Sequence, residues 1–234
     1  MPSKKRSSPS RKAPLIVGTI STLAGLKRLL RGRRVPCHIV EIRFDLIGTR
    51  HLPAVLRLIP GLRKRRKPRL PVLGTFRSHR EGGRLRLTDS RRASYIDTFY
   101  PLVDLVDIEA SSKAVLAKFL KRAEIPVVVS YHNFKTTPSL PSLKRFVRSV
   151  IRRPETIAKI ACNLRNPKDL ECLRKLLRSS PPGRVAAVGM GRMGPLSRFW
   201  LPFQGSVLTY GFLDRSAAPG QVSAEELAKF FRLR

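Results

Sequence analysis

The stretch Ile157-Ala158-Lys159-Ile160-Ala161-Cys162 is a short apolar run with one lysine inside it. A run of this length and composition predicts a buried strand. Burying an ammonium group without a partner is costly, so a buried lysine tends to lose its proton and can then attack carbonyl groups. The alternative is a lysine that points outward from an edge strand or is paired with a carboxylate. The rest of the chain bears on this choice.

Seven other runs of similar character recur along the 234 residues. The eight β-rich segments are 15–20, 37–44, 70–76, 105–110, 125–132, 157–163, 185–190 and 206–213. Segments with helical character lie between most of them. Eight strand–helix units in a chain of this length predict an α/β fold of the (β/α)8 TIM-barrel type. A doubly wound open sheet is the alternative, but no Gly-rich phosphate-binding turn follows the first strand.

The helical segments are recognised by their spacing and their end signals. Residues 52–65, 112–123 and 167–178 carry apolar residues three and four apart, and Asn166-Pro167 is a helix-start signal. Ser223 and Glu226 predict a capping box for the last helix, and a short helix is expected over 195–201. In such a barrel, functional side chains lie at or just after the carboxyl ends of the strands.

The charge of the chain is unusual, whereas its hydrophobic content of 42% is typical of a globular protein. Lys and Arg number 48 against 15 Asp and Glu, a net charge of +33 that attracts polyanions and small anions alike. No aromatic interleaving and no helix-turn-helix or RNA-recognition signature accompanies the basic residues. We therefore expect a solvated basic surface with incidental polyanion affinity. Residues 1–12 are expected to be a basic, disordered tail and 13–234 a single barrel domain.

Cys37, Cys162 and Cys172 contain no C-x-x-C pair, so neither a disulfide framework nor a zinc site is indicated. Reduced thiols and a cytoplasmic location are the expectation. Residues 1–26 resemble the first two regions of a signal peptide, but basic residues follow where a cleavage site would lie. No run is long enough to span a membrane.

Charged residues interrupt the second predicted strand. Alternation puts Glu41, Arg43 and Asp45 on one face, which points into the barrel if the apolar face packs against helices. The third strand is followed by a loop with Arg77 and Glu81, and the fifth ends near His132. We interpret these residues as a polar site at the barrel mouth. The alternatives are a structural Glu–Arg–Asp ion network and a structural histidine.

These segments together resemble the type I 3-dehydroquinate dehydratase family. The motifs are E-x-R-x-D at 41–45, T-x-R-x-x-x-E-G-G at 75–83, D-x-E at 107–109, S-x-H-x-F-x-x-T-P at 130–138, K-I-A at 159–161, M-G-x-x-G-x-x-S-R at 190–198 and A-P-G-Q at 218–221. Each motif alone is weak, but seven in order are specific. The resemblance implies a hydro-lyase (EC 4.2.1.10) of the shikimate pathway, a homodimer that binds the small anion 3-dehydroquinate.

The resemblance also implies roles for individual residues. Lys159 forms an imine with the substrate ketone, His132 is the general acid/base, and Glu81 tunes His132. Further side chains are similar to the family's substrate contacts: Glu41, Arg43 and Arg77 toward hydroxyl groups, Arg198 toward the carboxylate, Met190 lining the pocket and Gln221 closing over the substrate. No metal or other cofactor is implied, because the protonated imine serves as the electron sink.

Two positions depart from the family pattern. Tyr210 stands where the family has phenylalanine, and Ala217 stands where a serine usually precedes Ala-Pro-Gly-Gln, a hydroxyl that Ser216 could replace. Other interpretations stay open from sequence. A class I aldolase barrel would also use a strand lysine, with Gly189 and Gly191 as a weak phosphate site. A basic nucleic-acid-binding protein and a non-catalytic barrel are the remaining two.

Overall fold

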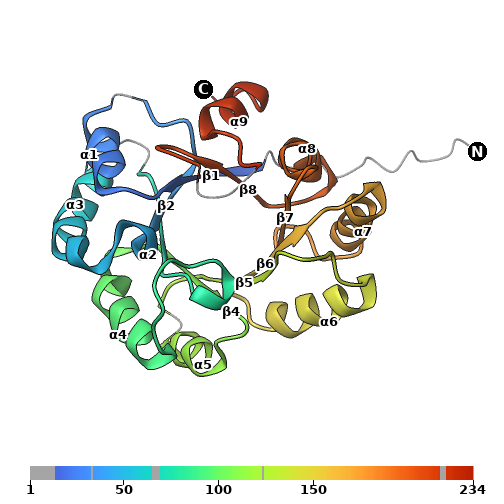
Figure 1. The fold of residues 1–234 in the computed structure, drawn as a ribbon, viewed down its shortest axis with the longest axis horizontal. Helices are drawn as coiled ribbons and strands as arrows, with labels where there is room; N and C mark the ends of the chain where they lie inside the picture. Colours follow the sequence, from blue (N-terminus) through green and yellow to red (C-terminus); the bar gives the residue numbers. More distant parts are fainter. Residues whose placement is uncertain (1–13, 33, 65–68, 123, 217–219, 234) are drawn as a thin grey trace, which may run out of the picture.

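Eight parallel strands follow one another around a nearly closed barrel (Figure 1), which confirms the predicted (β/α)8 fold. The computed structural model describes residues 14–32, 34–64, 69–122, 124–216 and 220–233, so the predicted tail of residues 1–12 lies outside the described residues. The strands are β1 (Leu15–Ile20), β2 (Ile39–Arg43), β3 (Val72–Thr75), β4 (Leu105–Glu109), β5 (Val127–Asn133), β6 (Thr156–Asn163), β7 (Val185–Met190) and β8 (Leu208–Phe212).

The strand order is β7-β6-β5-β4-β3-β2-β1-β8, so the first strand pairs with the last. In that pair Val17 lies opposite Tyr210. Between β7 and β8, the two ends of this order, the Val207 N–H donates to the Val185 carbonyl at 3.0 Å. Asp214, just after β8, accepts bonds from the main-chain N–H and the hydroxyl of both Ser21 and Thr22.

Helices form the outer ring, as Figure 1 shows. They are α1 (Leu23–Arg31), α2 (Phe44–Ile47), α3 (Leu52–Lys64), α4 (Asp89–Phe99), α5 (Lys113–Arg122), α6 (Leu140–Ile151), α7 (Pro167–Arg178), α8 (Gly194–Trp200) and α9 (Ala224–Phe230). The predicted capping box of α9 is present, with Ser223 and Glu226 each bonding the other's main chain. Within the described residues, no helix is both long and apolar enough to cross a bilayer.

The second predicted strand ends earlier than expected, and this corrects the position of Asp45. The chain leaves the strand at Arg43 and turns at once into the short helix α2, which contains Asp45. Strand alternation therefore applies to Glu41 and Arg43 only. Asp45 is fully buried and reaches Arg43 from α2 instead of continuing the strand face.

Two cores follow from the alternation of side chains along each strand. One lies between strands and helices, and a smaller one fills the barrel interior. A TIM barrel stacks interior layers of four side chains from alternate strands. The even-numbered strands supply an apolar layer of Ile39, Leu105, Ile157 and Leu208. Two residues further along the same strands are Glu41, Asp107, Lys159 and Tyr210, which we call the polar layer.

Candidate active site

Lys159 projects from β6 into the barrel and is only 6% exposed. Its Nζ donates to Asp107 Oδ2 at 3.0 Å and lies 4.0 Å from the centroid of the Tyr210 ring. The surroundings are therefore not the purely apolar ones that the flanking sequence suggests. Lys159 is both buried and paired with a carboxylate, which combines the two interpretations that the sequence leaves open.

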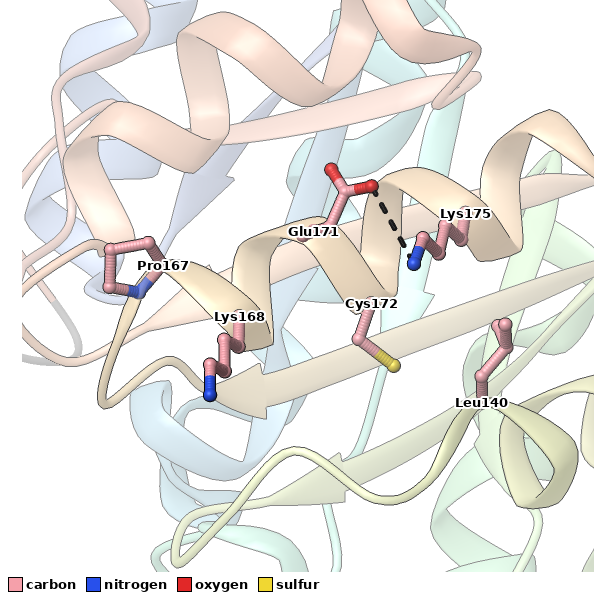
Figure 2. Close-up of a pocket in the computed structure, with 6 residues that line it drawn as sticks. All are labelled: Leu140, Pro167, Lys168, Glu171, Cys172 and Lys175. Atoms are coloured by element: carbon pink, nitrogen blue, oxygen red, sulfur yellow. Dashed lines mark ion pairs between the residues drawn. The ribbon is translucent and has the colours of Figure 1, made fainter.

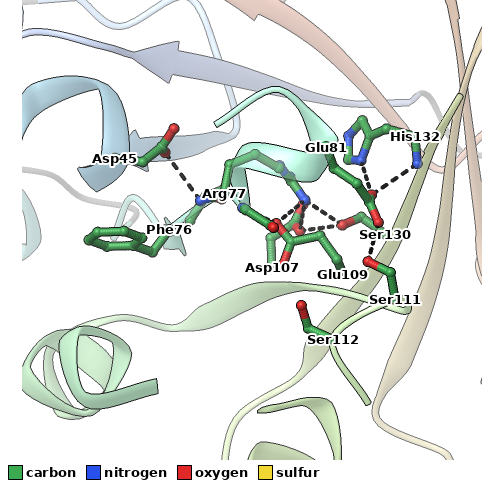
Figure 3. A network of polar contacts seen from close by, with 12 residues as sticks. Asp45, Phe76, Arg77, Glu81, Asp107, Glu109, Ser111, Ser112, Ser130 and His132 are labelled. Carbon is green, nitrogen blue, oxygen red and sulfur yellow. Dashed lines mark hydrogen bonds and ion pairs between the residues drawn. The ribbon is translucent and has the colours of Figure 1, made fainter. Parts of the chain in front are cut away.

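Asp107 belongs to a larger buried network (Figure 3), which Lys159 joins through its bond to this carboxylate. Its Oδ1 accepts from the Ser130 hydroxyl at 2.6 Å and lies 2.9 Å from Arg77 Nη1. Arg77 Nη1 also donates to Glu109 Oε1 at 3.1 Å, and Glu109 pairs on its other side with the fully buried Arg92. Burial alone would raise the pKa of Asp107, but the cations of Arg77 and Lys159 hold that pKa well below its usual range.

His132 lies near the end of β5 and is oriented by Glu81. Its main-chain N–H donates to Glu81 Oε2 at 3.1 Å, and its Nδ1 lies 2.8 Å from the same oxygen. Burial raises the pKa of Glu81, although the Ser111 hydroxyl that donates to it acts in the opposite direction. Burial, and then the charges of Arg77 and Lys159, lower the pKa of His132 well below its ordinary value, so the ring is neutral at pH 7.

The loop after β3 positions Glu81 through two glycines. Gly82 has φ +85°, a backbone conformation that favours glycine. A Cβ at Gly83 would lie 2.0 Å from the Arg77 carbonyl oxygen, so no larger residue fits there without movement. The tight turn brings Glu81 back over the barrel mouth toward His132.

Glu41 and Arg43 lie two residues apart on β2, but they have different partners. Both carboxylate oxygens of Glu41 accept hydroxyl bonds at 2.8 Å, one from Thr19 and one from Thr75. Arg43 makes a bidentate pair with Asp45, at 2.9 Å through Nε and 2.8 Å through Nη2. The ion network considered from the sequence is therefore an Arg43–Asp45 pair, with Glu41 held by hydroxyl groups.

Arg198, on α8, is held in a cradle of main-chain carbonyls. Its Nε donates to the main-chain carbonyl of Tyr210 at 3.1 Å, and its Nη1 donates to the carbonyls of Gly189, Gly194 and Gly220 at 2.8–3.3 Å. Burial lowers the pKa of Arg198 to about 10, which leaves it cationic at neutral pH. No carboxylate pairs with it within the part of the chain that the structure describes, in contrast to Arg43, Arg77 and Lys159.

One pocket, with a cavity volume of about 120 Å³, brings the predicted residues together at the barrel mouth. Its lining includes all nine predicted site residues: Glu41, Arg43, Arg77, Glu81, His132, Lys159, Met190, Arg198 and Gln221. Gln221 also accepts from the Ser216 hydroxyl at 3.5 Å. The Ala217 departure falls outside the described residues.

A larger hollow of about 510 Å³ lies between α6 and α7 (Figure 2). It is lined by Leu140, Pro167, Lys168, Glu171, Cys172 and Lys175. Its charged groups are ordinary surface residues, with Lys175 4.0 Å from Glu171. Burial raises the pKa of the Cys172 thiol, which makes it a poor nucleophile. Size alone therefore does not locate the chemistry, and the smaller polar pocket is the candidate active site.

Sequence reasoning missed several contacts at this pocket. Asp107 and Glu109 belong to the D-x-E motif, but no role was assigned to either residue from the sequence. They alternate along β4 as Glu41 and Arg43 do along β2. That alternation is a signal that could have placed them inside the barrel. The hydroxyl groups of Thr19 and Thr75 carry no comparable signal, because threonine is common in strands.

Comparison with known proteins agrees with this geometry. The family model for type I 3-dehydroquinase matches residues 16–234. The chain belongs to the type I 3-dehydroquinase family. Membership makes the protein a carbon–oxygen lyase of class EC 4.2.1.10. The 3-dehydroquinate dehydratase of Methanosarcina barkeri is 32% identical over 214 residues, which span 87% of this chain and 88% of that protein.

Solved structures of the family also match. The 3-dehydroquinate dehydratase of Aquifex aeolicus has a TM-score of 0.76 at 29% identity and covers 92% of this chain and 96% of its own. The Clostridium difficile type I enzyme, solved with covalently modified comenic acid, has a TM-score of 0.77 at 25% identity and covers 94% of this chain and 92% of its own.

Proposed function

We propose that this protein converts 3-dehydroquinate to 3-dehydroshikimate and water through a Schiff base on Lys159, a step of the shikimate pathway. The observation that carries the proposal is the buried Lys159 Nζ, 3.0 Å from Asp107 in a pocket that also holds His132. Membership of the type I 3-dehydroquinase family supports the substrate. The reaction requires no added cofactor.

The imine makes a weakly acidic proton removable. The Lys159 amine adds to the ketone carbon, the resulting carbinolamine loses water, and the imine takes up one proton, which the final hydrolysis releases again. His132 takes the proton from the adjacent carbon, and the C–H electrons move into an enamine. The enamine re-forms the imine as it expels the β-hydroxyl, which leaves as water with the proton from His132. Water then hydrolyses the imine, so the net change is the loss of one water. Proton transfer of this kind contributes roughly 10²–10⁴ in rate.

His132 suits this role because of its partner and its charge state. If Nδ1–H donates to Glu81, Nε2 presents a lone pair to the pocket. The lowered pKa of His132 keeps that lone pair available at neutral pH. Glu81 thus acts as a positioning residue that fixes the tautomer and the ring orientation.

Arg198 is the proposed partner of the substrate carboxylate. The other cationic side chains of the pocket are paired with protein carboxylates, namely Arg43 with Asp45, Arg77 with Asp107 and Glu109, and Lys159 with Asp107. A buried cation with carbonyl partners alone gains most from an incoming anion. We assign hydroxyl contacts to Glu41, Arg43 and Arg77, with Met190 lining the pocket and Gln221 covering it.

Borohydride trapping tests the central step. Incubation with 3-dehydroquinate and borohydride is expected to leave one stable adduct, which peptide mapping places on Lys159. Lys159→Ala is expected to lose both adduct and turnover. Lys118→Ala, which removes an exposed lysine paired with Asp97, is the matched control and should keep both. An adduct on another lysine, or turnover by Lys159→Ala, would overturn the mechanism.

We also propose that the protein is a homodimer in the cytoplasm. Phe203 and Phe230 are each about half exposed and their rings lie 6.0 Å apart near the end of the chain. Exposed aromatic clusters of this kind are typical of subunit contacts. Light scattering should give twice the chain mass, and a monomer would contradict the proposal. The three cysteines are free, which fits a reducing compartment.

Polyanion affinity is proposed to be incidental to catalysis. The first 80 residues contain two acidic residues, Glu41 and Asp45, and both are buried in the site. The outer surface of α1 and α3 is therefore basic with no acidic residue of its own. Neutralising Lys4–Arg6 and Arg63–Lys67 should reduce salt-sensitive heparin retention and leave kcat within a few-fold. Loss of activity in a folded variant would contradict a merely solvating role.

A further inference from the structure

Tyr210 contacts the proposed reacting nitrogen, yet the mechanism above assigns it no part. Lys159 Nζ lies 4.0 Å from the ring centroid of Tyr210, and both side chains are nearly excluded from solvent, at 6% and 5% exposure. The ring comes from β8, and the only other polar contact that the described residues provide for Nζ is Asp107. Lys159 Nζ is thus flanked by a carboxylate and an aromatic ring.

The hydroxyl of Tyr210 does not account for this placement. Its oxygen is buried and has no hydrogen-bond partner among the residues that the structure describes. An unpaired buried hydroxyl destabilises the folded state. Burial, and then the charges of Glu41 and Asp107, raise the pKa of Tyr210 well above its usual value, so the phenol stays neutral. The part of Tyr210 that bears on Lys159 is therefore the ring.

An aromatic ring interacts favourably with a nearby cation through its negative face. Lys159 must give up its proton to attack the ketone, and the resulting neutral amine gains little from this interaction, whereas the protonated imine formed next on the same nitrogen carries a positive charge. Catalysis gains from contacts that are stronger at the charged stage than before it. The value of a cation–π contact rises when water is excluded, to about 2 kcal/mol. Both groups here are buried, so the contact is of the strong kind.

We propose that Tyr210 is an additional catalytic residue, whose ring stabilises the protonated imine on Lys159. This rests on the proposed Schiff-base function. A contact of roughly 0.5–2 kcal/mol corresponds to roughly a 2- to 30-fold change in the rate of imine-dependent turnover. The competing explanation is packing, in which Tyr210 only fills the polar layer. The two differ because packing depends on side-chain volume, whereas a cation–π contact depends on the electron density of the ring.

A fluorination series at position 210 separates them in the full-length protein. Tyr210→Phe keeps the ring and removes the unpaired hydroxyl, so it is the reference for the series, and we expect it to have a higher Tm. Tyr210→4-fluoro-Phe, →3,5-difluoro-Phe and →3,4,5-trifluoro-Phe change volume little but weaken the negative face step by step. We expect kcat and the rate of borohydride trapping to fall with each fluorine, and Tyr210→Leu to be slowest.

Fluorination at Phe99 is the matched control. Phe99 is fully buried in the outer core against Phe44, away from the pocket, so Phe99→3,4,5-trifluoro-Phe should leave kcat unchanged. If kcat and the trapping rate did not change with fluorination at position 210 while the imine was still trapped on Lys159, this inference alone would be overturned. Rates that follow Tm rather than fluorine number would do the same, since they would indicate packing. Absence of any imine in the unmodified protein would overturn the proposed function and this inference together.

Discussion

Two neighbouring levels of the barrel interior differ completely in chemistry, although the same four strands build both. The lower level consists of Ile39, Leu105, Ile157 and Leu208. The polar layer directly above it consists of Glu41, Asp107, Lys159 and Tyr210. Because side chains alternate along a strand, a step of two residues keeps the direction and changes only the height. The packed apolar level stabilises the barrel. The polar layer can hold several charged groups close together because this packed level supports it.

After Lys159→Ala, the largest expected effect lies just above the polar layer, at His132. His132→Ala should lower kcat by roughly 10²–10⁴ because the proposed general acid/base is lost, while borohydride is still expected to trap an imine on Lys159. Steady-state kinetics and mass spectrometry measure the two effects. His51→Ala, in the single 3-10 turn just before α3 and outside the pocket, is the control and should retain full activity.

The pH profile of the unmodified enzyme sharpens the same prediction. In the proposed mechanism the neutral ring of His132 is the base, so activity is expected above the pKa of His132 and should fall as the pH drops through that pKa. Because that pKa is lowered well below 6.5, the acid limb of kcat/KM should lie below pH 6.5. An acid limb near or above 6.5 would count against His132 as the base.

Stability should also distinguish the two levels. Arg77→Met leaves Asp107 and Glu109 without their shared cation, and breaking a buried pair in this way costs roughly 3–5 kcal/mol. Ile39→Val removes one methyl group from the apolar level and should cost about 0.5–1.5 kcal/mol. Urea unfolding at pH 7 gives both values. Equal losses of unfolding free energy in the two variants would contradict the larger contribution expected from the ion network.

The smallest effect is expected at the amino end of the barrel. The Ile16 N–H donates to His38 Nδ1 at 3.0 Å, where a neutral ring is required. Burial lowers the pKa of His38 below 6.5, so its stabilising contribution is present above pH 6.5 and is lost as pH falls through the lowered pKa. His38→Ala should cost roughly 0.5 kcal/mol at pH 7.5, since the site is part-exposed, and nothing at low pH. Unfolding curves at the two pH values test this, and an equal loss at both would contradict it.

Periodicity and local signals predicted much of this structure. Alternation on the second strand correctly placed Glu41 and Arg43 inward, because both lie in regular β-structure. The same alternation was wrong for Asp45, since α2 begins at Phe44, directly after the strand, and ends the period of two. Some strand limits were set too wide, as for 206–213 against β8, because apolar residues continue into the adjoining turns.

Contacts between distant strands were beyond the reach of local patterns. Asp107 and Lys159 are 52 residues apart, and their pairing follows from barrel closure rather than from either flanking sequence. The same holds for the ring of Tyr210. The carbonyl cradle of Arg198 is made by main-chain groups, which no side-chain motif encodes. These contacts determine the electrostatics of the pocket.

The pairing of β1 with β8 has a consequence for synthesis of the protein. β1 emerges from the ribosome early, yet its partner β8 and the clamp at Asp214 come about 190 residues later. At ~5–20 residues per second, the first strand waits roughly 10–40 s for that partner. During this time one edge of a parallel sheet stays unpaired, a state prone to association with other chains. The polar layer cannot be completed until Tyr210 is synthesised, so an incomplete chain lacks the assembled pocket.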